Sequence, residues 1–187
     1  METDLHYQFP PLIEPSELAQ RVKALAGEIV STLGTQPIVV VALLKGAFVF
    51  AADLIRSLSQ HGVSSEIEFL IASSYGAGTY STGQVTMHWL GKSPLTGKRV
   101  LLIDDILDTG LTLSKVKEQI LKENPASCHV VVLLDKPSRR NVPMTADFVG
   151  FPIDDHFVVG YGLDYAEQHR DLPYVAILPP EARSSGS

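Results

Sequence analysis

The sequence predicts an α/β fold in which a mostly parallel, twisted sheet is flanked by helices. Apolar runs rich in β-branched residues, such as PIVVVALL (37–44) and CHVVVLLD (128–135), are typical of strands that are buried on both faces. These runs alternate with segments in which apolar residues recur at helical spacing. Alternating helices and buried strands indicate a sheet that carries helices on both sides.

The first helix is expected over residues 15–34, because Leu18, Val22 and Leu25 begin a helical repeat and Gly34 suits its end. The other elements are assigned by the same patterns. They are a buried strand at 37–44, a helix at 46–62, strands at 64–73, 85–90 and 99–104, a helix at 111–124, and strands at 128–135, 147–151, 156–160 and 174–179.

Length and composition indicate one soluble domain, 1–187, since no repeat or long linker divides the chain. A net charge of −6 disfavours a protein that coats nucleic acid, so nucleic acid is not expected as a partner. No segment reaches the roughly 18 apolar residues of a membrane helix, and the N-terminus does not resemble a signal peptide. A cytoplasmic protein without membrane contact is therefore expected, with its single cysteine, Cys128, as a buried structural thiol.

The segment VLLIDDILDTGLTL (100–113) ends a buried strand with acids, which we call the acidic turn (residues 104–112). Asp104 and Asp105 are neighbours on an extended chain, so their side chains are expected to diverge and to reach two hydroxyls of one ligand. Asp108 and Gly110 then lead into a helix whose N-terminal N–H groups favour a phosphate. Capping the helix would need only one acid, so the cluster indicates a sugar-phosphate site.

The acidic turn resembles the phosphoribosyl-diphosphate-binding motif of the type I phosphoribosyltransferases, and the surrounding pattern is similar to their hypoxanthine-guanine branch. The resemblance spans about residues 9 to 178. It implies a small hood built from about 1–15 and about 150–180. The supporting motifs, in chain order, are LLKGAF, SSYG, LLDKPSRR, DFVGF, FVVGYGLDY and RDLPYV.

The resemblance implies that a 6-oxopurine displaces pyrophosphate from C1 of phosphoribosyl diphosphate. Asp104 and Asp105 would hold the ribose hydroxyls, although the family usually has Glu where this chain has the shorter Asp104. The segment Asp108, Thr109, Gly110, Leu111 and Thr112 would wrap the 5′-phosphate. Asp108 would also accept the N7 proton of the purine as general base.

The other motifs imply the pyrophosphate site. Lys45 and Gly46 would bind pyrophosphate after a Leu44–Lys45 peptide that can be cis in this family, and Arg170 would clamp it. Arg140 matches a further family arginine on the pyrophosphate side. Asp164 would approach a Mg²⁺ ion that also binds pyrophosphate oxygens.

The base site is implied by two motifs. Lys136 would donate to O6, because an ammonium group has only donors and opposes the amino group of adenine. Phe157 would stack on the purine, and the backbone of Val158 would contact its edge. Ser74 and Tyr75 would form the core of a mobile loop that closes over the reacting centre.

Two alternatives stay open at this point. A regulator on the same scaffold could sense phosphoribosyl diphosphate, although it would not need both Asp108 and Lys136. A xanthine-preferring enzyme would show much the same residues. The resemblance also implies a homodimer or homotetramer.

Overall fold

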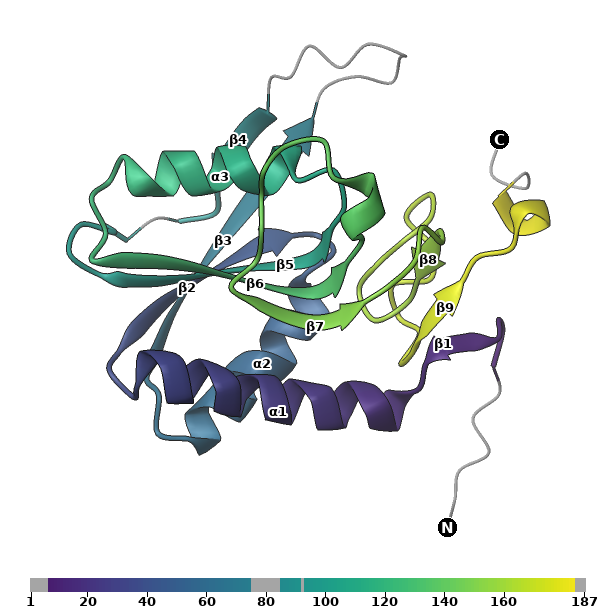
Figure 1. Cartoon of the computed structure of the whole chain (residues 1–187), viewed down its shortest axis with the longest axis horizontal. Coiled ribbons are helices and arrows are strands. Elements are labelled where there is room, and N and C mark those ends of the chain that lie inside the picture. Colours follow the sequence, from purple (N-terminus) through teal and green to yellow (C-terminus); the bar gives the residue numbers. More distant parts are fainter. Residues whose placement is uncertain (1–6, 75–84, 92, 184–187) are drawn as a thin grey trace.

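The computed structural model describes residues 7–74, 85–91 and 93–183 (Figure 1). Its elements follow one another in the order that an α/β chain predicts. They are β1 (Pro11–Ile13), α1 (Pro15–Leu33), β2 (Ile38–Leu44), α2 (Phe48–Gln60), β3 (Ser65–Ser74), β4 (Val85–Trp89), β5 (Arg99–Leu107), α3 (Leu111–Leu121), β6 (Ser127–Asp135), a 3₁₀ turn (Pro137–Arg139), β7 (Phe148–Pro152), β8 (Val158–Val159), β9 (Val175–Ile177) and a second 3₁₀ turn (Pro180–Arg183).

Six strands form the main sheet in the order β4-β3-β2-β5-β6-β7. Four of its neighbouring pairs are parallel, and only β4 runs antiparallel, beside β3 at one edge. The predicted class, a mostly parallel sheet with flanking helices, is confirmed. Because parallel strands place their carboxyl ends at one edge, the loops that follow β2, β5 and β6 lie near one another.

The helices cover both faces of this sheet, with α1 and α2 on one side and α3 on the other (Figure 1). The core is accordingly divided in two. One part packs alternate strand residues such as Val40 and Leu101 against α1 and α2. The other packs the intervening residues, such as Val41 and Leu102, against α3. This alternation explains why the strands are apolar throughout.

Some helices and strands begin or end at other residues than expected, because contacts with neighbouring elements determine where they stop. Strand β5 continues through the acids to Leu107 instead of ending at residue 104, because β6 pairs with it as far as Leu107 opposite Asp135. Helix α1 begins after Glu14, whose N–H donates to the Glu17 carboxylate at 2.9 Å. Helix α3 ends at Leu121, three residues early, and Asn124 follows in the left-handed region with φ of 53°.

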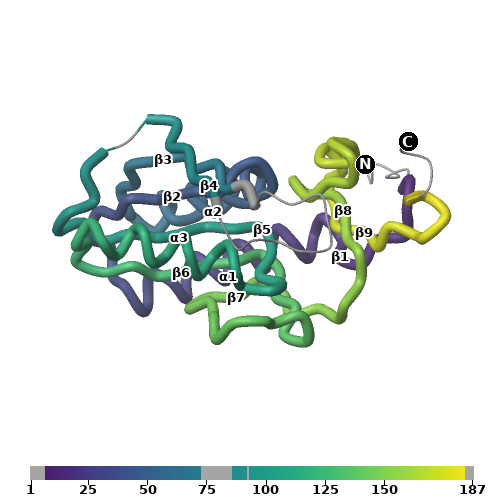
Figure 2. The backbone as a smooth tube through the Cα atoms, turned by 90° about the horizontal axis from the view of Figure 1, so that it is seen from above, coloured from purple at the N-terminus to yellow at the C-terminus, as the bar shows by residue number. Residues whose placement is uncertain are grey.

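A second sheet of three strands, β1-β9-β8, forms the hood. It joins segments from near the two ends of the described chain, and β1 and β9 lie side by side in both views (Figures 1 and 2). A strand at 11–13 had no sequence signal, since three residues are too few to show an alternating pattern. Strand β7 still belongs to the main sheet, so the hood begins after residue 152.

In the described part of the chain, none of the helices has the length and apolar character needed to span a membrane.

Candidate active site

A cavity of about 240 Å³ opens at the carboxyl ends of β2 and β5, beside the start of α3. The acidic turn supplies most of its wall, and the rest comes from the end of β2, Gly46, β3 and α3. Its polar lining includes three carboxylates, so the structure brings together the acids that the sequence singled out. The lining residues are Leu43, Leu44, Gly46, Ala72, Asp104, Asp105, Ile106, Leu107, Asp108, Gly110, Thr112 and Leu113.

Asp104 and Asp105 are partly buried at the end of β5, and their carboxyl groups interact directly. The expectation that these side chains diverge is therefore wrong. Each carboxylate also accepts the backbone N–H of the next residue, Asp105 N at 3.0 Å and Ile106 N at 2.9 Å. Burial raises the pKa of Asp104 well above its usual range, and the charge of Asp105 adds to the effect.

Burial also raises the pKa of Asp105, but several contacts counteract it. These are the hydrogen bond with Asp104, the N–H of Ile106 and the positive charge of Arg170. Of the two acids, Asp105 is therefore better prepared to stay ionised, and Asp104 is the one that retains a proton more readily.

Gly46 lies directly against Asp105. A Cβ at position 46 would stand 1.7 Å from Oδ2 of Asp105, so only glycine allows the loop after β2 to approach the acid this closely. The Leu44–Lys45 peptide that precedes it is cis, as the resemblance implied. Gly162 also packs against Gly46, since a Cβ at position 162 would stand 2.2 Å from the carbonyl oxygen of Gly46.

The remainder of the acidic turn is shaped for the start of α3. Asp108 accepts the N–H of Thr109, and Thr109 Oγ1 lies 3.4 Å from the N–H of Leu111. Gly110 adopts φ of 81°, and a Cβ there would stand 2.9 Å from the Cβ of Met144. The glycine thus permits both the left-handed turn and its close packing.

Arg140 lies against the end of β5. Its guanidinium donates to the carbonyls of Leu107 and Asp108 and pairs with Asp135 at the end of β6, and its place on the pyrophosphate side stays a prediction. Strand pairing ends at Leu107, and the next carbonyl, that of Asp108, accepts a hydrogen bond from the guanidinium. Arg140 therefore braces the turn that carries Asp108.

Lys136 follows β6 and is fixed to the neighbouring strand, because its N–H donates to the Leu107 carbonyl at 2.9 Å. Its side chain is only 11% exposed and lies 3.8 Å from an Asp155 carboxylate oxygen. Burial lowers the pKa of Lys136, while the charges of Asp155 and Asp108 oppose that change. The charge of Asp108, the expected base, thus acts on Lys136, the expected O6 donor.

Phe157 and Val158 stand at the start of the hood. The Phe157 ring is 39% exposed and meets Tyr165 edge-on, with 5.6 Å between ring centroids. Sequence reasoning missed Arg183, whose guanidinium carbon lies 5.0 Å from the Phe157 centroid and whose Nη2 donates to the Leu178 carbonyl at 2.9 Å. No local sequence pattern around residue 183 predicts this contact, because it depends on how the hood folds.

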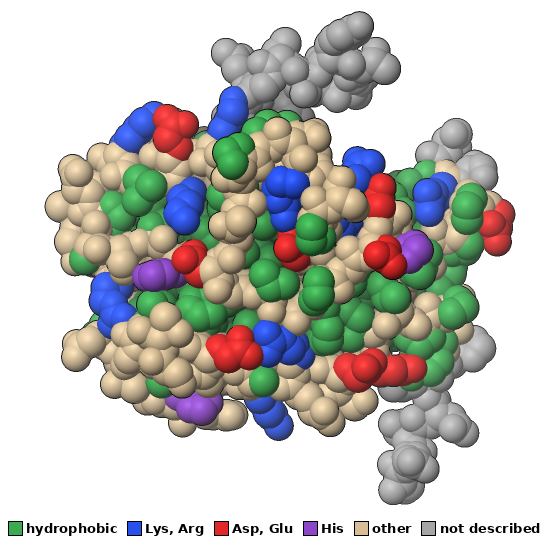
Figure 3. Space-filling model, viewed as in Figure 1, with side chains coloured by type: hydrophobic (Ala, Val, Ile, Leu, Met, Phe, Trp, Pro, Cys, Tyr) green, Lys and Arg blue, Asp and Glu red, His purple; other side chains and the backbone are tan. Residues whose placement is uncertain are grey.

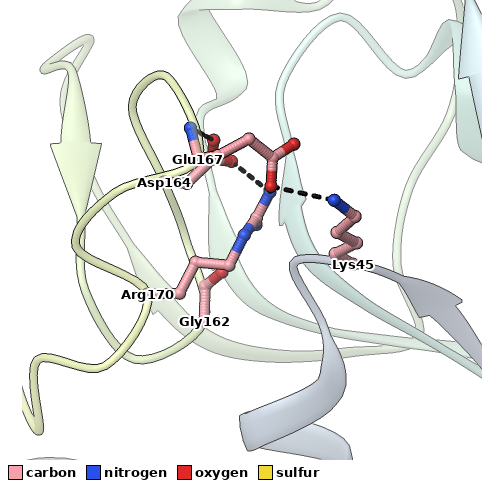
Figure 4. A network of polar contacts seen from close by, with 5 residues as sticks. All are labelled: Lys45, Gly162, Asp164, Glu167 and Arg170. Atoms are coloured by element: carbon pink, nitrogen blue, oxygen red, sulfur yellow. Dashed lines mark hydrogen bonds and ion pairs between the residues drawn. The ribbon is translucent and has the colours of Figure 1, made fainter.

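The loop 160–170 completes the region and is drawn in Figure 4. Arg170 donates to the Gly162 carbonyl at 2.9 Å and pairs with Asp164 at 2.8 Å. Lys45 reaches this loop from the end of β2 and pairs with Glu167 at 2.9 Å. The sequence indicated Asp164, Lys45 and Arg170, but it gave no role to Glu167, which joins the two cations.

Four residues of this loop that are not glycine have a positive φ, a conformation that is rare for L-residues. They are Tyr161, Ala166, Glu167 and His169. Such conformations persist only where surrounding contacts hold them, and they concentrate at functional sites. One of these contacts is the hydrogen bond from the Tyr161 hydroxyl to Asp53 of α2.

The expected mobile loop at Ser74 and Tyr75 stays a prediction, because Tyr75 and the side chain of Ser74 lie outside the described residues.

Cys128, the single cysteine, is partly buried. Burial raises its pKa to about 11, which makes it a poor nucleophile at neutral pH.

Within residues 7–74, 85–91 and 93–183, no group of three or more His, Cys, Asp or Glu side chains is arranged to hold a metal ion by itself. Asp164 uses one oxygen for Arg170 and the other for the N–H of Glu167. Each carboxylate oxygen keeps a second lone pair. This donor set suits an ion that is held by one protein acid together with substrate oxygens and water, as Mg²⁺ often is.

Comparison with known proteins agrees with this geometry. Residues 13–166 match the phosphoribosyl transferase domain family. The hypoxanthine-guanine phosphoribosyltransferase of Aquifex aeolicus is 46% identical over 168 residues, which are 89% of this chain and 93% of that protein. The hypoxanthine phosphoribosyltransferase of Escherichia coli is 43% identical over 166 residues, 88% of this chain and 92% of that one.

A solved structure has the same fold. It is a variant of the hypoxanthine phosphoribosyltransferase from Trypanosoma cruzi in a ternary complex with substrates, and it superimposes with a TM-score of 0.88 at 38% identity. The match covers 94% of this chain and 99% of that one. Family match, sequence identity and fold agree, and this chain belongs to the phosphoribosyl transferase domain family.

Proposed function

We propose that this protein transfers the 5-phosphoribosyl group of phosphoribosyl diphosphate to N9 of hypoxanthine or guanine, as an enzyme of purine salvage. The observation that carries the proposal is the cavity in which Asp104, Asp105 and Asp108 meet beside Gly46 and the start of α3. The names of the similar proteins from Aquifex aeolicus and Escherichia coli support the choice of base.

The acidic turn would hold the sugar-phosphate. Asp104 and Asp105 would accept hydrogen bonds from the two ribose hydroxyls, with Asp105 as the stronger acceptor because it ionises more readily. The backbone and hydroxyls of Thr109 to Thr112 would bind the 5′-phosphate at the N-terminus of α3, where N–H groups and the helix dipole favour an anion.

The opposite side of the cavity would hold the pyrophosphate. Lys45 and Arg170 would bind its oxygens, and the backbone of Gly46 would come close to them. Asp164 would hold Mg²⁺ together with pyrophosphate oxygens and water. When bound, this ion would supply positive charge that stabilises the leaving group.

The base would lie between Lys136 and Phe157. Lys136 would donate to O6, and Phe157 would stack on the ring while Val158 contacts its edge through the backbone. As N9 bonds to C1, the C1–O bond breaks and its electron pair leaves with pyrophosphate. Asp108 takes the proton from N7, so that the product base remains neutral.

The partners proposed are small molecules and a second copy of the chain. On the face shown in Figure 3, basic side chains stand singly among acidic ones, which gives no broad basic surface for nucleic acid. Large apolar side chains are exposed at Phe48 on α2 and at Ile67 and Phe69 on β3. Such side chains favour a homodimer or homotetramer, and light scattering measures the assembly directly.

The test is a spectrophotometric assay with phosphoribosyl diphosphate and Mg²⁺, in which hypoxanthine, guanine, xanthine, adenine and uracil are offered separately. Nucleotide formation from hypoxanthine or guanine, lost on adding a chelator, is the expected result. Turnover of xanthine alone would show that xanthine, and not hypoxanthine or guanine, is the base that the enzyme uses. Binding of phosphoribosyl diphosphate without turnover of any base would contradict the enzyme and favour a sensor.

A further inference from the structure

Glu167 occupies a position between the two cations that would bind pyrophosphate. It belongs to the loop 160–170, has φ of 64°, and donates its N–H to Asp164 Oδ2 at 2.9 Å. This backbone conformation turns its side chain toward the end of β2 (Figure 4). Its Oε2 lies 2.9 Å from Lys45 Nζ and 3.5 Å from Arg170 Nη2.

A single carboxylate oxygen therefore contacts both cations. A pyrophosphate oxygen that contacts Lys45 and Arg170 together competes with the Glu167 carboxylate for the same two cations. Two anions held between the same two cations repel one another. Binding of pyrophosphate through both cations therefore favours displacement of the Glu167 side chain.

The ion pair of Lys45 with Glu167 is weak enough to be broken when a ligand binds. The side chains of Lys45 and Glu167 are 62% and 66% exposed, and exposed ion pairs contribute little to stability. The other carboxylate on Arg170 differs. Asp164 is 28% exposed and Arg170 19%, at 2.8 Å, so their pair is better shielded from water than that of Lys45 with Glu167.

Resting on the proposed function, we propose that Glu167 is an internal stand-in for pyrophosphate: its carboxylate fills the anion position between turnovers, is displaced by the pyrophosphate group of the substrate, and returns as the product leaves. Glu167 neutralises Lys45 and Arg170 in the free protein, and it limits how tightly the diphosphate is held. It is a positioning residue that tunes affinity and release, and it takes no part in bond making.

The experiment compares Glu167→Gln with the wild type and with Glu118→Gln. Gln keeps the size and shape of Glu, so only the charge is lost. Glu118 pairs with Lys122 on α3 at the same 2.9 Å, with side-chain exposures of 65% and 57%, so its variant loses an equivalent ion pair away from the site. Binding of inorganic pyrophosphate in the presence of Mg²⁺ is measured by calorimetry, and the KM values for phosphoribosyl diphosphate and hypoxanthine are measured alongside.

We expect Glu167→Gln to bind pyrophosphate about three- to tenfold more tightly, because one competing charge is gone. The gain should shrink as salt is added. The KM for phosphoribosyl diphosphate should fall with it, the KM for hypoxanthine should not change, and Glu118→Gln should match the wild type. Damage to the loop alone would weaken binding and so would not mimic this result.

Unchanged or weaker pyrophosphate binding in Glu167→Gln, with a wild type that binds pyrophosphate and forms nucleotide, would overturn the role of Glu167 alone. A wild type that neither binds pyrophosphate nor forms nucleotide would overturn the proposed function, and the role of Glu167 with it.

Discussion

The acidic turn and the loop 160–170 both pack against Gly46, and they hold their charged groups in different ways. The carboxylates of the acidic turn are partly buried at a strand end and accept backbone N–H groups of neighbouring residues. In the loop, Arg170 pairs with Asp164 and Glu167, which are close to it in the sequence, and Glu167 also pairs with the distant Lys45. One side is held by backbone N–H groups, and the other by ion pairs, of which that of Lys45 with Glu167 is exposed.

This difference fits what each side would bind. A ribose is positioned by hydrogen bonds of fixed direction, and groups fixed by the backbone supply these without rearrangement. A diphosphate arrives and must later leave, so a site of exposed ion pairs suits it better. Variants on the two sides should therefore act differently: on catalysis and stability for the turn, and on affinity for the loop.

The largest effect is expected from Asp108→Asn. Asn can still donate and accept hydrogen bonds but cannot take the N7 proton, so kcat should fall by about 10² to 10⁴ while substrate binding changes little. Steady-state kinetics with hypoxanthine measures both quantities, and Asp154→Asn, an exposed acid, is the control. An unchanged kcat would remove Asp108 as the base.

A smaller effect is expected from Gly46→Ala, which tests the contact between the two sides. The new Cβ would collide with the Asp105 carboxyl, so the loop or the acid must shift. The KM for phosphoribosyl diphosphate should rise by about tenfold or more, since misplacing binding groups by an ångström has effects of that size. Gly27→Ala is the control, because a Cβ at position 27 meets nothing within 4 Å. Normal kinetics in Gly46→Ala would show that the two sides are independent.

The same comparison explains how much the sequence could predict. The buried strands, the three helices and the acids at residues 104 to 108 follow from patterns within a few residues, so they could be read locally. The length of β5 could not, because pairing with β6 extends it to Leu107. The position of Arg140 follows from that extension, since its guanidinium donates to the carbonyls of Leu107 and Asp108 where the pairing ends.

The loop 160–170 was harder to predict for a physical reason. Glu167 is three residues from both Asp164 and Arg170, yet its partner Lys45 is 122 positions away. Arg183 contacts Phe157 only because the hood brings the two together. Contacts of this kind depend on the complete fold and leave no periodic trace in the sequence.

Lys136 belongs with the fixed side, because its N–H bonds to the Leu107 carbonyl. In Lys136→Ala the preference for hypoxanthine over adenine should fall by an amount equivalent to about 1–3 kcal/mol, the cost of an unpaired buried donor. Since burial lowers the pKa of Lys136, purine binding should also weaken on the alkaline side at a pH below that typical of lysine. The ratio of the kcat/KM values for hypoxanthine and adenine measures this preference, and Lys122→Ala is the control. Unaltered selectivity would remove Lys136 from the O6 position.

The smallest effect is expected from Asp104→Asn, which should raise the stability of the protein and lower its affinity for phosphoribosyl diphosphate. The raised pKa of Asp104 means that the folded protein favours its protonated form. As pH rises from about 4, the ordinary pKa of aspartate, toward the raised native value, the wild type loses stability relative to its unfolded state. Asn carries no charge and avoids this loss.

At neutral pH the free energy of unfolding of Asp104→Asn should therefore exceed that of the wild type by on the order of 1 kcal/mol. Urea unfolding at pH 7 and at pH 3 measures the difference, which should disappear at pH 3, where aspartate is protonated in both states. The affinity for phosphoribosyl diphosphate should fall, because one ribose acceptor is weakened. Asp154→Asn should change neither quantity. If Asp104→Asn were less stable at pH 7, the carboxylate would be a stabilising part of the fold. A gain in stability together with weaker binding would show that the Asp104 carboxylate strengthens ligand binding while it lowers the free energy of unfolding of the ligand-free protein.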